Sequence, residues 1–193
     1  MKRLHVPMVY VEVEVRDRNG RLLKRIRKRS DSFVRNFMLM LFIGFTWGSQ
    51  NIVKQDGSTV SISASADIGE VFYVRGKSGE SNYGILVGSG TKSFSIDDYS
   101  LESKIPHGTS PGQLSYGESS IEGLFDDGTK LYFRVIRTFT NNSGSSITVS
   151  EVGLASKGNG NYPLIARDLL PSPVSVPDGS TLTVRYIIQY TYA

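Results

Sequence analysis

Two pairs of adjacent carboxylates, Asp97-Asp98 and Asp126-Asp127, are the residues whose type and spacing first suggest chemistry. Paired carboxylates can act as general acid and base, or can hold a calcium ion. However, neighbouring residues of a strand point to opposite faces, and both pairs lie beside turns. Aspartate is favoured in turns because its side chain bonds the nearby backbone. We therefore interpret both pairs as turn residues.

Histidine and cysteine offer no second route to catalysis. The chain has two histidines, His5 and His107, far apart in sequence, and no cysteine. Disulfides and thiolate metal sites are thereby excluded, and a multi-histidine zinc or iron centre is not expected. His107 lies near many serines but without a Gly-x-Ser-x-Gly elbow, so we interpret it as an exposed loop residue. We predict that the protein is not an enzyme and has no cofactor or metal.

The densest charge of the chain is the run Lys24-Arg-Ile-Arg-Lys-Arg29. Residues 1–40 hold 11 Lys and Arg against 4 Asp and Glu, whereas the remainder holds 11 against 14. A basic end of this kind attracts nucleic acid or another anionic surface, or the mildly acidic body of a second subunit. The residues of a possible anionic contact are Lys24, Arg25, Arg27, Lys28 and Arg29.

A hairpin gives the same basic run a structural explanation. Asn19-Gly20 is a strong signal for a two-residue hairpin turn. That turn places Arg25 opposite Glu14. It also places Arg27 opposite Glu12, so both arginines gain a cross-strand partner of opposite charge. We favour this interpretation over nucleic-acid binding, which stays possible.

Strands are the elements predicted to position these residues. Residues 9–16 alternate valine with polar side chains, the period-2 pattern of a half-buried strand. Lys24 and Lys28 return on the valine face, where only their stems can be buried. Roughly ten strands without an internal repeat predict an all-β fold, a β-sandwich or jelly roll. Beyond the strands at 9–16 and 21–29, we predict strands at 52–55, 59–64, 71–75, 83–87, 114–116, 120–124, 130–140, 146–154, 163–169 and 181–192.

One helix is predicted, over residues 32–45. Its apolar residues recur at helical spacing after the N-cap candidates Ser30-Asp-Ser32. Leu39, Met40 and Ile43 make it apolar on nearly all sides, so we expect it to be buried. We divide the chain into residues 1–49, a hairpin and apolar helix that form an appendage for assembly, and residues 50–193, the β-sandwich domain.

Five tyrosines keep a second function open. Exposed tyrosines stack on sugar rings, as in a glycan-binding adhesin or tail-fibre module, whereas aromatic residues on strands usually pack in cores and interfaces. The residues are Tyr73, Tyr83, Tyr99, Tyr116 and Tyr132.

Three segments resemble uncharacterised structural proteins of tailed phages and of viruses of thermophilic archaea. They are Ser32-Phe-Val-Arg-Asn-Phe37 after the basic hairpin, Gly84-Ile-Leu-Val-Gly-Ser-Gly-Thr91 leading to Ile96-Asp-Asp-Tyr-Ser-Leu101, and residues 140–154. The resemblance touches much of the chain from about residue 30 onward. It implies a component of a virion, tail or filament, and it implies no catalytic residues.

We therefore expect a non-enzymatic viral structural protein, part of a capsid, tail or filament. It self-assembles as a homo-oligomer, with other virion proteins as possible partners. Both terminal strands, 9–15 and 181–192, are expected to offer unpaired edges to a neighbouring subunit. Residues 37–45 are too short to cross a bilayer, and no signal peptide is evident, so we expect synthesis in the host cytoplasm and a place in a virion or extracellular assembly. The predicted assembly residues are Val9, Val11, Val13, Val15, Phe37, Leu41, Tyr190 and Tyr192.

Overall fold

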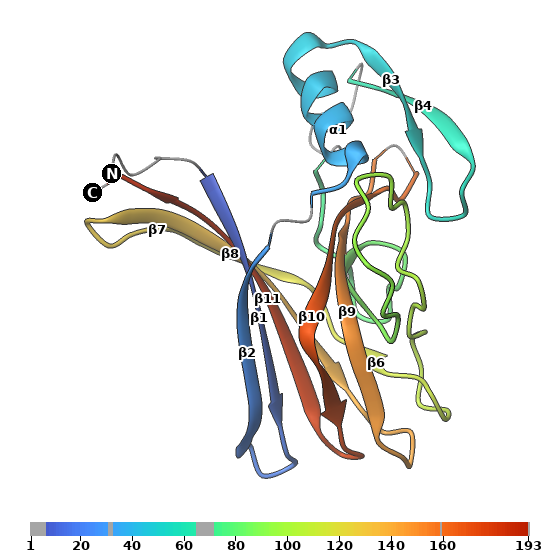
Figure 1. Ribbon diagram of the computed structural model, residues 1–193, viewed down its shortest axis with the longest axis vertical. Coiled ribbons are helices and arrows are strands. Elements are labelled where there is room, and N and C mark those ends of the chain that lie inside the picture. The colour runs from blue at the N-terminus through green and yellow to red at the C-terminus, as the bar shows by residue number, and fades with distance from the viewer. Residues whose placement is uncertain (1–6, 31–32, 65–71, 159, 193) are drawn as a thin grey trace.

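The structure is a computed structural model that describes residues 7–30, 33–64, 72–158 and 160–192 (Figure 1). In these residues the chain is mostly β, with one helix and several antiparallel sheets, which confirms the predicted all-β, sandwich-like fold class.

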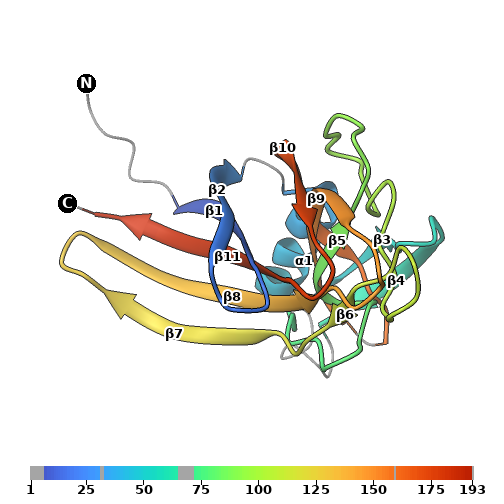
Figure 2. The same cartoon turned by 90° about the horizontal axis from the view of Figure 1, so that it is seen from below.

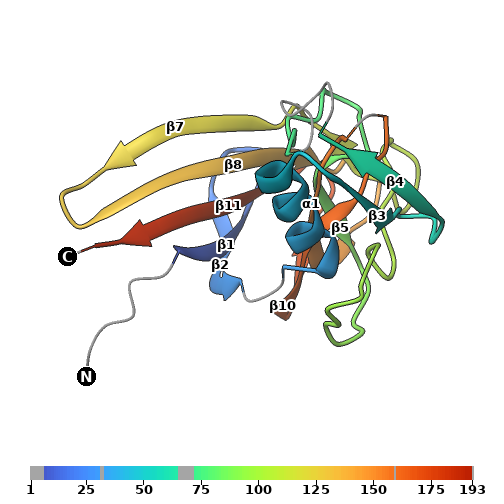
Figure 3. The same ribbon diagram turned by 90° about the horizontal axis from the view of Figure 1, so that it is seen from above.

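The large sheet has the strand order β2–β1–β11–β8, and both β6 and β7 pair with the other side of β8. All neighbouring strands in it are antiparallel. In Figures 2 and 3 the β7–β8 hairpin and the end of β11 extend beyond the small sheet as an arm. The strands are β1 (Pro7–Arg16), β2 (Leu22–Ser30), β6 (Ser115–Tyr116), β7 (Ser120–Asp126), β8 (Lys130–Thr140) and β11 (Thr181–Thr191).

The small sheet, in the order β10–β9–β5, covers one face of the large sheet. Alternate side chains of β1 and β11 point toward it and form the core with the buried residues of β9 and β10. The small sheet consists of β5 (Gly84–Gly88), β9 (Ile147–Ala155) and β10 (Leu164–Val176), and a separate hairpin consists of β3 (Ser49–Val53) and β4 (Thr59–Ser63).

The terminal strands are paired on both sides, so the prediction that they offer free edges is wrong. β1 lies between β2 and β11, and β11 lies between β1 and β8. The two ends of the chain complete one another, because Pro7 to Arg16 pair with Tyr190 to Thr181. The hairpin is therefore continuous with the main sheet, and the boundary that we placed after residue 49 does not coincide with a break in pairing.

The β1–β2 hairpin has the predicted register but a different turn. Glu14 faces Arg25 and Glu12 faces Arg27, as the sequence predicted. The Asp17 amide donates to the Arg21 carbonyl, which encloses a three-residue loop with Gly20 at φ 80°. An irregularity between the Val15 and Arg16 pairings absorbs the extra residue and restores the register.

Most predicted strands are present, with shifted ends. β8 begins and ends at the predicted residues, whereas β10 continues past the predicted end at residue 169. Pro171 and Pro173 did not stop β10, because they lie at an edge of the sheet and inside a register shift between Leu169 and Val174. The predicted strand at 71–75 is absent from the described residues, where Tyr73 forms only an isolated bridge; residue 71 lies outside them.

The helix α1 (Arg35–Thr46) is only partly buried, so its predicted burial on more than one side is wrong. Asn36, Met40 and Ile43 are its buried residues. α1 packs on β3 and β10 at one end of the sandwich, rather than between the sheets (Figures 1 and 3). The apolar side chains on the remaining sides of α1 are partly or largely exposed among the residues that the structure describes.

Candidate functional site

The valines predicted as an assembly surface lie in the core. Each of them exposes at most 6% of its surface, because their face of β1 is covered by the small sheet. Phe37 and Leu41 are half-buried, and Phe37 stacks on Phe33 with ring centroids 3.8 Å apart. Tyr190 and Tyr192 are exposed near the end of the arm. The buried valines are Val9, Val11, Val13 and Val15.

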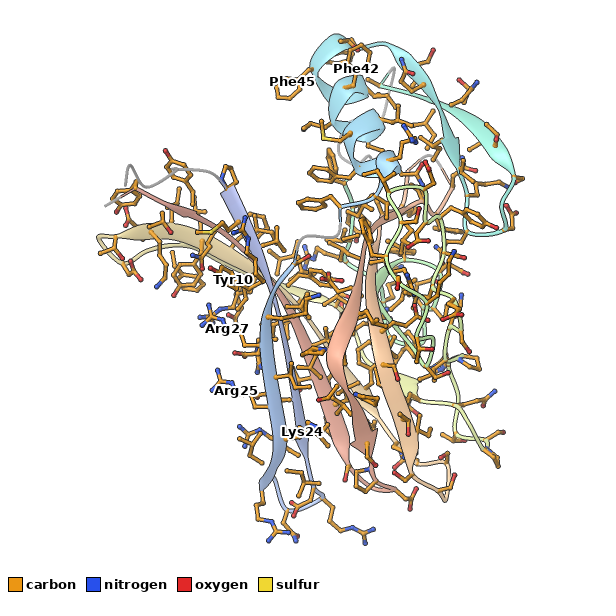
Figure 4. All side chains as sticks on the ribbon, in the orientation of Figure 1. Tyr10, Lys24, Arg25, Arg27, Phe42 and Phe45 are labelled. Atoms are coloured by element: carbon orange, nitrogen blue, oxygen red, sulfur yellow. The ribbon has the colours of Figure 1, made fainter. Side chains whose placement is uncertain are left out.

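The outer side of α1 carries an exposed apolar surface, which we call the helix patch. Phe42 and Phe45 project into solvent there (Figure 4). Arg35, in the first turn, is the one charged residue of α1, so no charged residue of the helix lies between Met38 and Phe45. The exposed fractions are 57% for Met38, 51% for Phe42, 80% for Phe45 and 66% for Trp47.

A second exposed apolar surface lies on β7, the outermost strand of the arm. Most residues of β7 are exposed, on both faces of the strand. Ile121, Leu124 and Phe125 are its large apolar side chains. Sequence reasoning predicted the strand but not its exposure, because a strand pattern does not show whether a second layer covers it.

The basic hairpin contributes to a polar groove of about 410 Å³ on the outer face of the large sheet. Figure 4 shows Arg25 and Arg27 on this side of β2, and Lys24 on the opposite side, toward the small sheet. The other lining residues come from β1, β8 and β11. The groove thus crosses β2, β1 and β11. Glu12 of β1 faces Arg27 of β2 on one side and Arg185 of β11 on the other.

Two carboxylates in the groove are held by arginines. Glu12 lies 2.6 Å from Arg25 and 3.1 Å from Arg185. Glu14 lies 3.1 Å from Arg185 and 3.4 Å from Arg25. Arg27 instead lies over the Tyr10 ring at 4.9 Å, so the predicted facing register holds while its ion pair with Glu12 does not form.

Cations and aromatic rings also meet at the arm end of the groove. The Arg134 guanidinium lies 5.2 Å from the Tyr132 ring and 5.8 Å from the Phe125 ring. Lys130 lies 5.8 Å from the Tyr132 ring. Such cation–aromatic contacts suit a flat, anionic ligand.

On the inner face, β2 is tied to the small sheet by a buried acid that sequence reasoning missed. The Lys28 ammonium lies 3.1 Å from Asp168, confirming that Lys28 is on the valine face. Asp168 also accepts hydrogen bonds from Ser30 at 2.8 Å and Tyr186 at 3.3 Å. Burial beside Asp168 raises the pKa of Tyr186 well above its usual value. The sequence did contain a signal for this acid: Lys28 lies on an apolar strand face, and a buried charge requires a partner of opposite charge.

The Asp97-Asp98 pair divides between two partners. Asp97 is exposed and binds Arg35 at 2.6 Å. Asp98 is buried; it accepts from the Ser95 amide and binds Arg167 at 2.9 Å. Arg167 in turn lies 2.8 Å from the fully buried Glu151. Asp98 is therefore a turn residue and also part of a buried ion network.

The other polar candidates behave as turn and loop residues. Asp127 accepts from the backbone of Thr129 and Lys130, and Asp126 accepts from the Gly128 amide, which confirms the turn interpretation. His107 is exposed, and its Nδ1 accepts from the Tyr116 amide at 3.1 Å.

The five tyrosines do not form one binding platform. Tyr116 is buried and stacks edge-on against Phe139, while Tyr132 lies on the outer face of the large sheet. Tyr73 and Tyr83 pack near one another with ring centroids 6.0 Å apart, and Tyr99 is exposed elsewhere.

Comparison with protein-family models, with curated proteins and with solved structures gave no match in any of the three. Among the residues that the structure describes, no group of three or more His, Asp or Glu is placed to hold a metal ion. In the same residues no helix has the length and apolar character to cross a membrane.

Proposed function

We propose that this protein is a non-enzymatic structural subunit that self-assembles into a viral particle, tail or filament. The observation that carries the proposal is the helix patch, where four large apolar side chains are more than half exposed. Burying one such side chain stabilises by about 1.5–3 kcal/mol. An exposed surface of this kind on a soluble chain marks an interaction site. The resemblance to viral structural proteins supports the nature of the assembly.

The position of the second apolar surface favours a head-to-tail assembly. The helix patch and β7 lie on different protrusions of the molecule (Figures 1 and 3). A two-fold dimer buries the same surface on both subunits, whereas two different surfaces suit head-to-tail contacts. Head-to-tail contacts generate a ring or a filament, the arrangement that a tail or filament subunit requires.

Light scattering coupled to size exclusion, with negative-stain imaging, tests the proposal. We expect the purified chain to form large particles, and a Phe42→Ser, Phe45→Ser double variant to shift them toward smaller species with an unchanged melting temperature. The matched control is Phe94→Ser with Ile96→Ser. These residues are also exposed and apolar, but they lie in the loop whose Ile96 carbonyl bonds Arg35, at the other end of α1. A wild-type chain that stays monomeric at all concentrations contradicts the proposal.

Nucleic-acid binding is the second candidate function, favoured by the cations and aromatic rings of the outer groove. Its test is the affinity for single-stranded DNA at rising salt, measured by fluorescence anisotropy. Binding through the groove should weaken steeply with salt and with Arg27→Ala plus Arg134→Ala. Affinity that the double variant leaves unchanged excludes the groove as the site.

A further inference from the structure

The large sheet ends in two strand edges of opposite character. In the described part of the chain, β2 pairs on one side only, with β1, and β7 pairs on one side only, with β8. Edge strands present unpaired amide and carbonyl groups, and a second chain can complete them. Neither β2 nor β7 contains a proline, which would block such pairing.

The β2 edge is basic. It carries five Lys and Arg and no acidic residue between Leu22 and Ser30. Arg25 and Lys28 are paired within the chain, with Glu12 and Asp168. Arg27 is exposed beside an aromatic ring, and Lys24 is exposed beside the Ser172 hydroxyl, so positive charge is left on this edge.

The β7 edge is acidic. Glu122 and Asp126 lie on β7, and Glu118 and Asp127 flank it, with no Lys or Arg from residue 117 to residue 129. Glu122 binds Arg134 at 2.7 Å, and Asp127 binds Lys130 at 2.8 Å. Both pairs are partly exposed, and Glu118 is exposed.

This distribution of charge selects one pairing among three. A β2 strand beside another β2 places lysines and arginines together, and a β7 strand beside another β7 places acids together. Like charges opposite one another destabilise paired strands, and such repulsion discriminates between partners. Only β2 beside β7 combines opposite charges.

We propose that β2 of one copy pairs with β7 of the next copy, so that the large sheet continues from subunit to subunit. The inference rests on the proposed self-assembly and assigns its contact. The apolar residues of β7, Ile121, Leu124 and Phe125, are then covered by the neighbour, together with the exposed Leu22 and Leu23 at the start of β2.

Two charge-reversal variants test this pairing. Counted with their ion-pair partners Glu12 and Asp168, the cations of β2 leave a net charge of +3, which Arg27→Glu with Arg29→Glu changes to −1. Counted with Arg134 and Lys130, the acids of the β7 edge leave a net charge of −2, which Glu118→Lys with Glu122→Lys changes to +2. Each variant alone then carries two edges of one sign. We expect each to raise the concentration at which assembly begins by about tenfold or more. A control with the charge change of the β2 variant, Lys54→Glu with Lys104→Glu, alters loop residues that line a pocket beside the β3–β4 hairpin and should assemble normally.

Mixing the two variants gives the decisive result. The acidic β2 edge of one then meets the basic β7 edge of the other, and the two unaltered edges also match. We expect the equimolar mixture to assemble while either component alone does not. Variants that assemble as the wild type does, or a mixture of folded variants that stays dissociated, overturn the β2–β7 contact. Wild-type assembly in the same experiment keeps the proposed function; its absence removes both.

Cysteine cross-linking checks the contact without relying on charge. The natural chain has no cysteine, so only introduced thiols react. An Arg27→Cys subunit is mixed in turn with a Ser120→Cys, an Ile121→Cys or a Glu122→Cys subunit. We expect disulfides only with cysteines on one face of β7, which means either with positions 120 and 122 or with position 121. Alternation follows from the two-residue period of a strand. Folded variants that form no disulfide, or equal yields at all three positions, contradict strand pairing.

Discussion

At the scale of single residues, the buried charges hold the two sheets together. Asp168 is fully buried and joins Lys28 and Ser30 of β2 to Tyr186 of β11. An acid in such a place is stable only when its partners are present, because an unpaired buried charge is costly. The contact between β2, β10 and β11 therefore depends on Asp168 and on each of its partners.

Removing this acid should strongly destabilise the fold. We expect Asp168→Ala to lower the free energy of unfolding by about 3–5 kcal/mol, because it leaves the Lys28 ammonium without its carboxylate. Urea denaturation measures the change. Asp97→Ala, which removes an exposed ion pair with Arg35, should cost only about 0–1 kcal/mol and serves as control. Equal effects of the two changes would contradict the structural role of Asp168.

Tyr186 should give the fold a stability that declines in alkali. Burial, and then the nearby Asp168 charge, raise its pKa in the folded state above the value near 10 of an unfolded tyrosine. The folded chain thus keeps a proton that the unfolded chain loses, so the stabilisation is present below about pH 10 and is lost as pH rises through the folded pKa. Burial also raises the pKa of Tyr116 to about 12, which adds to the same decline. We expect Tyr186→Phe to flatten the fall of unfolding free energy above about pH 10, whereas Tyr99→Phe, at an exposed position, should leave its slope unchanged.

At the scale of elements, alternation of apolar and polar residues predicted strands well. The β8 bounds and the register of the β1–β2 hairpin were both readable, because each depends on neighbours in sequence. The three-residue loop could not be predicted, because Asn19-Gly20 fits both a two-residue and a three-residue turn. The irregularity between the Val15 and Arg16 pairings then gives both turns the same register farther along the hairpin.

The candidate surfaces were less predictable, because exposure depends on distant elements. Phe42 and Phe45 belong to a predicted apolar helix, but the sequence does not show that they are exposed among the residues that the structure describes. Asp168 lies far from Lys28 in sequence, so only the fold brings the pair together. The opposite error occurred at β1. Its valine face was predicted to be an exposed interface, but the valines are buried in the core.

Two glycines should respond in opposite ways to alanine. Gly20 has φ 80°, a conformation that costs an L-residue about 1 kcal/mol or more, so Gly20→Ala should lower the melting temperature. Gly44 lies inside α1, and among the described residues outside its own stretch of helix an added methyl meets no atom within 4 Å. Gly44→Ala should stabilise by about 0.5–1 kcal/mol through its helix propensity. Thermal unfolding of both variants measures this; a rise with Gly20→Ala would contradict the turn geometry.

At the scale of the whole molecule, the amino-terminal hairpin is inseparable from the rest. β1 pairs along its length with β11 and supplies core valines. We therefore expect deletion of residues 1–29 to unfold the body, as measured by circular dichroism and thermal melting. A truncated chain with a cooperative transition near that of the full chain would show that the remaining sandwich is self-sufficient.

The strand count of the large sheet has a consequence for symmetry. From β2 through β1, β11 and β8 to β7 there are five antiparallel strands, so the two outer strands run in the same direction. Copies joined there with their faces aligned meet as parallel strands. Each copy adds roughly 24 Å across the strands, at about 4.8 Å per strand. A twist of about 20–25° per strand turns each copy by roughly 100–125° relative to the last. If the proposed β2–β7 contact forms, the resulting helix would be left-handed with about three copies per turn, and successive small sheets would point away from one another around the axis.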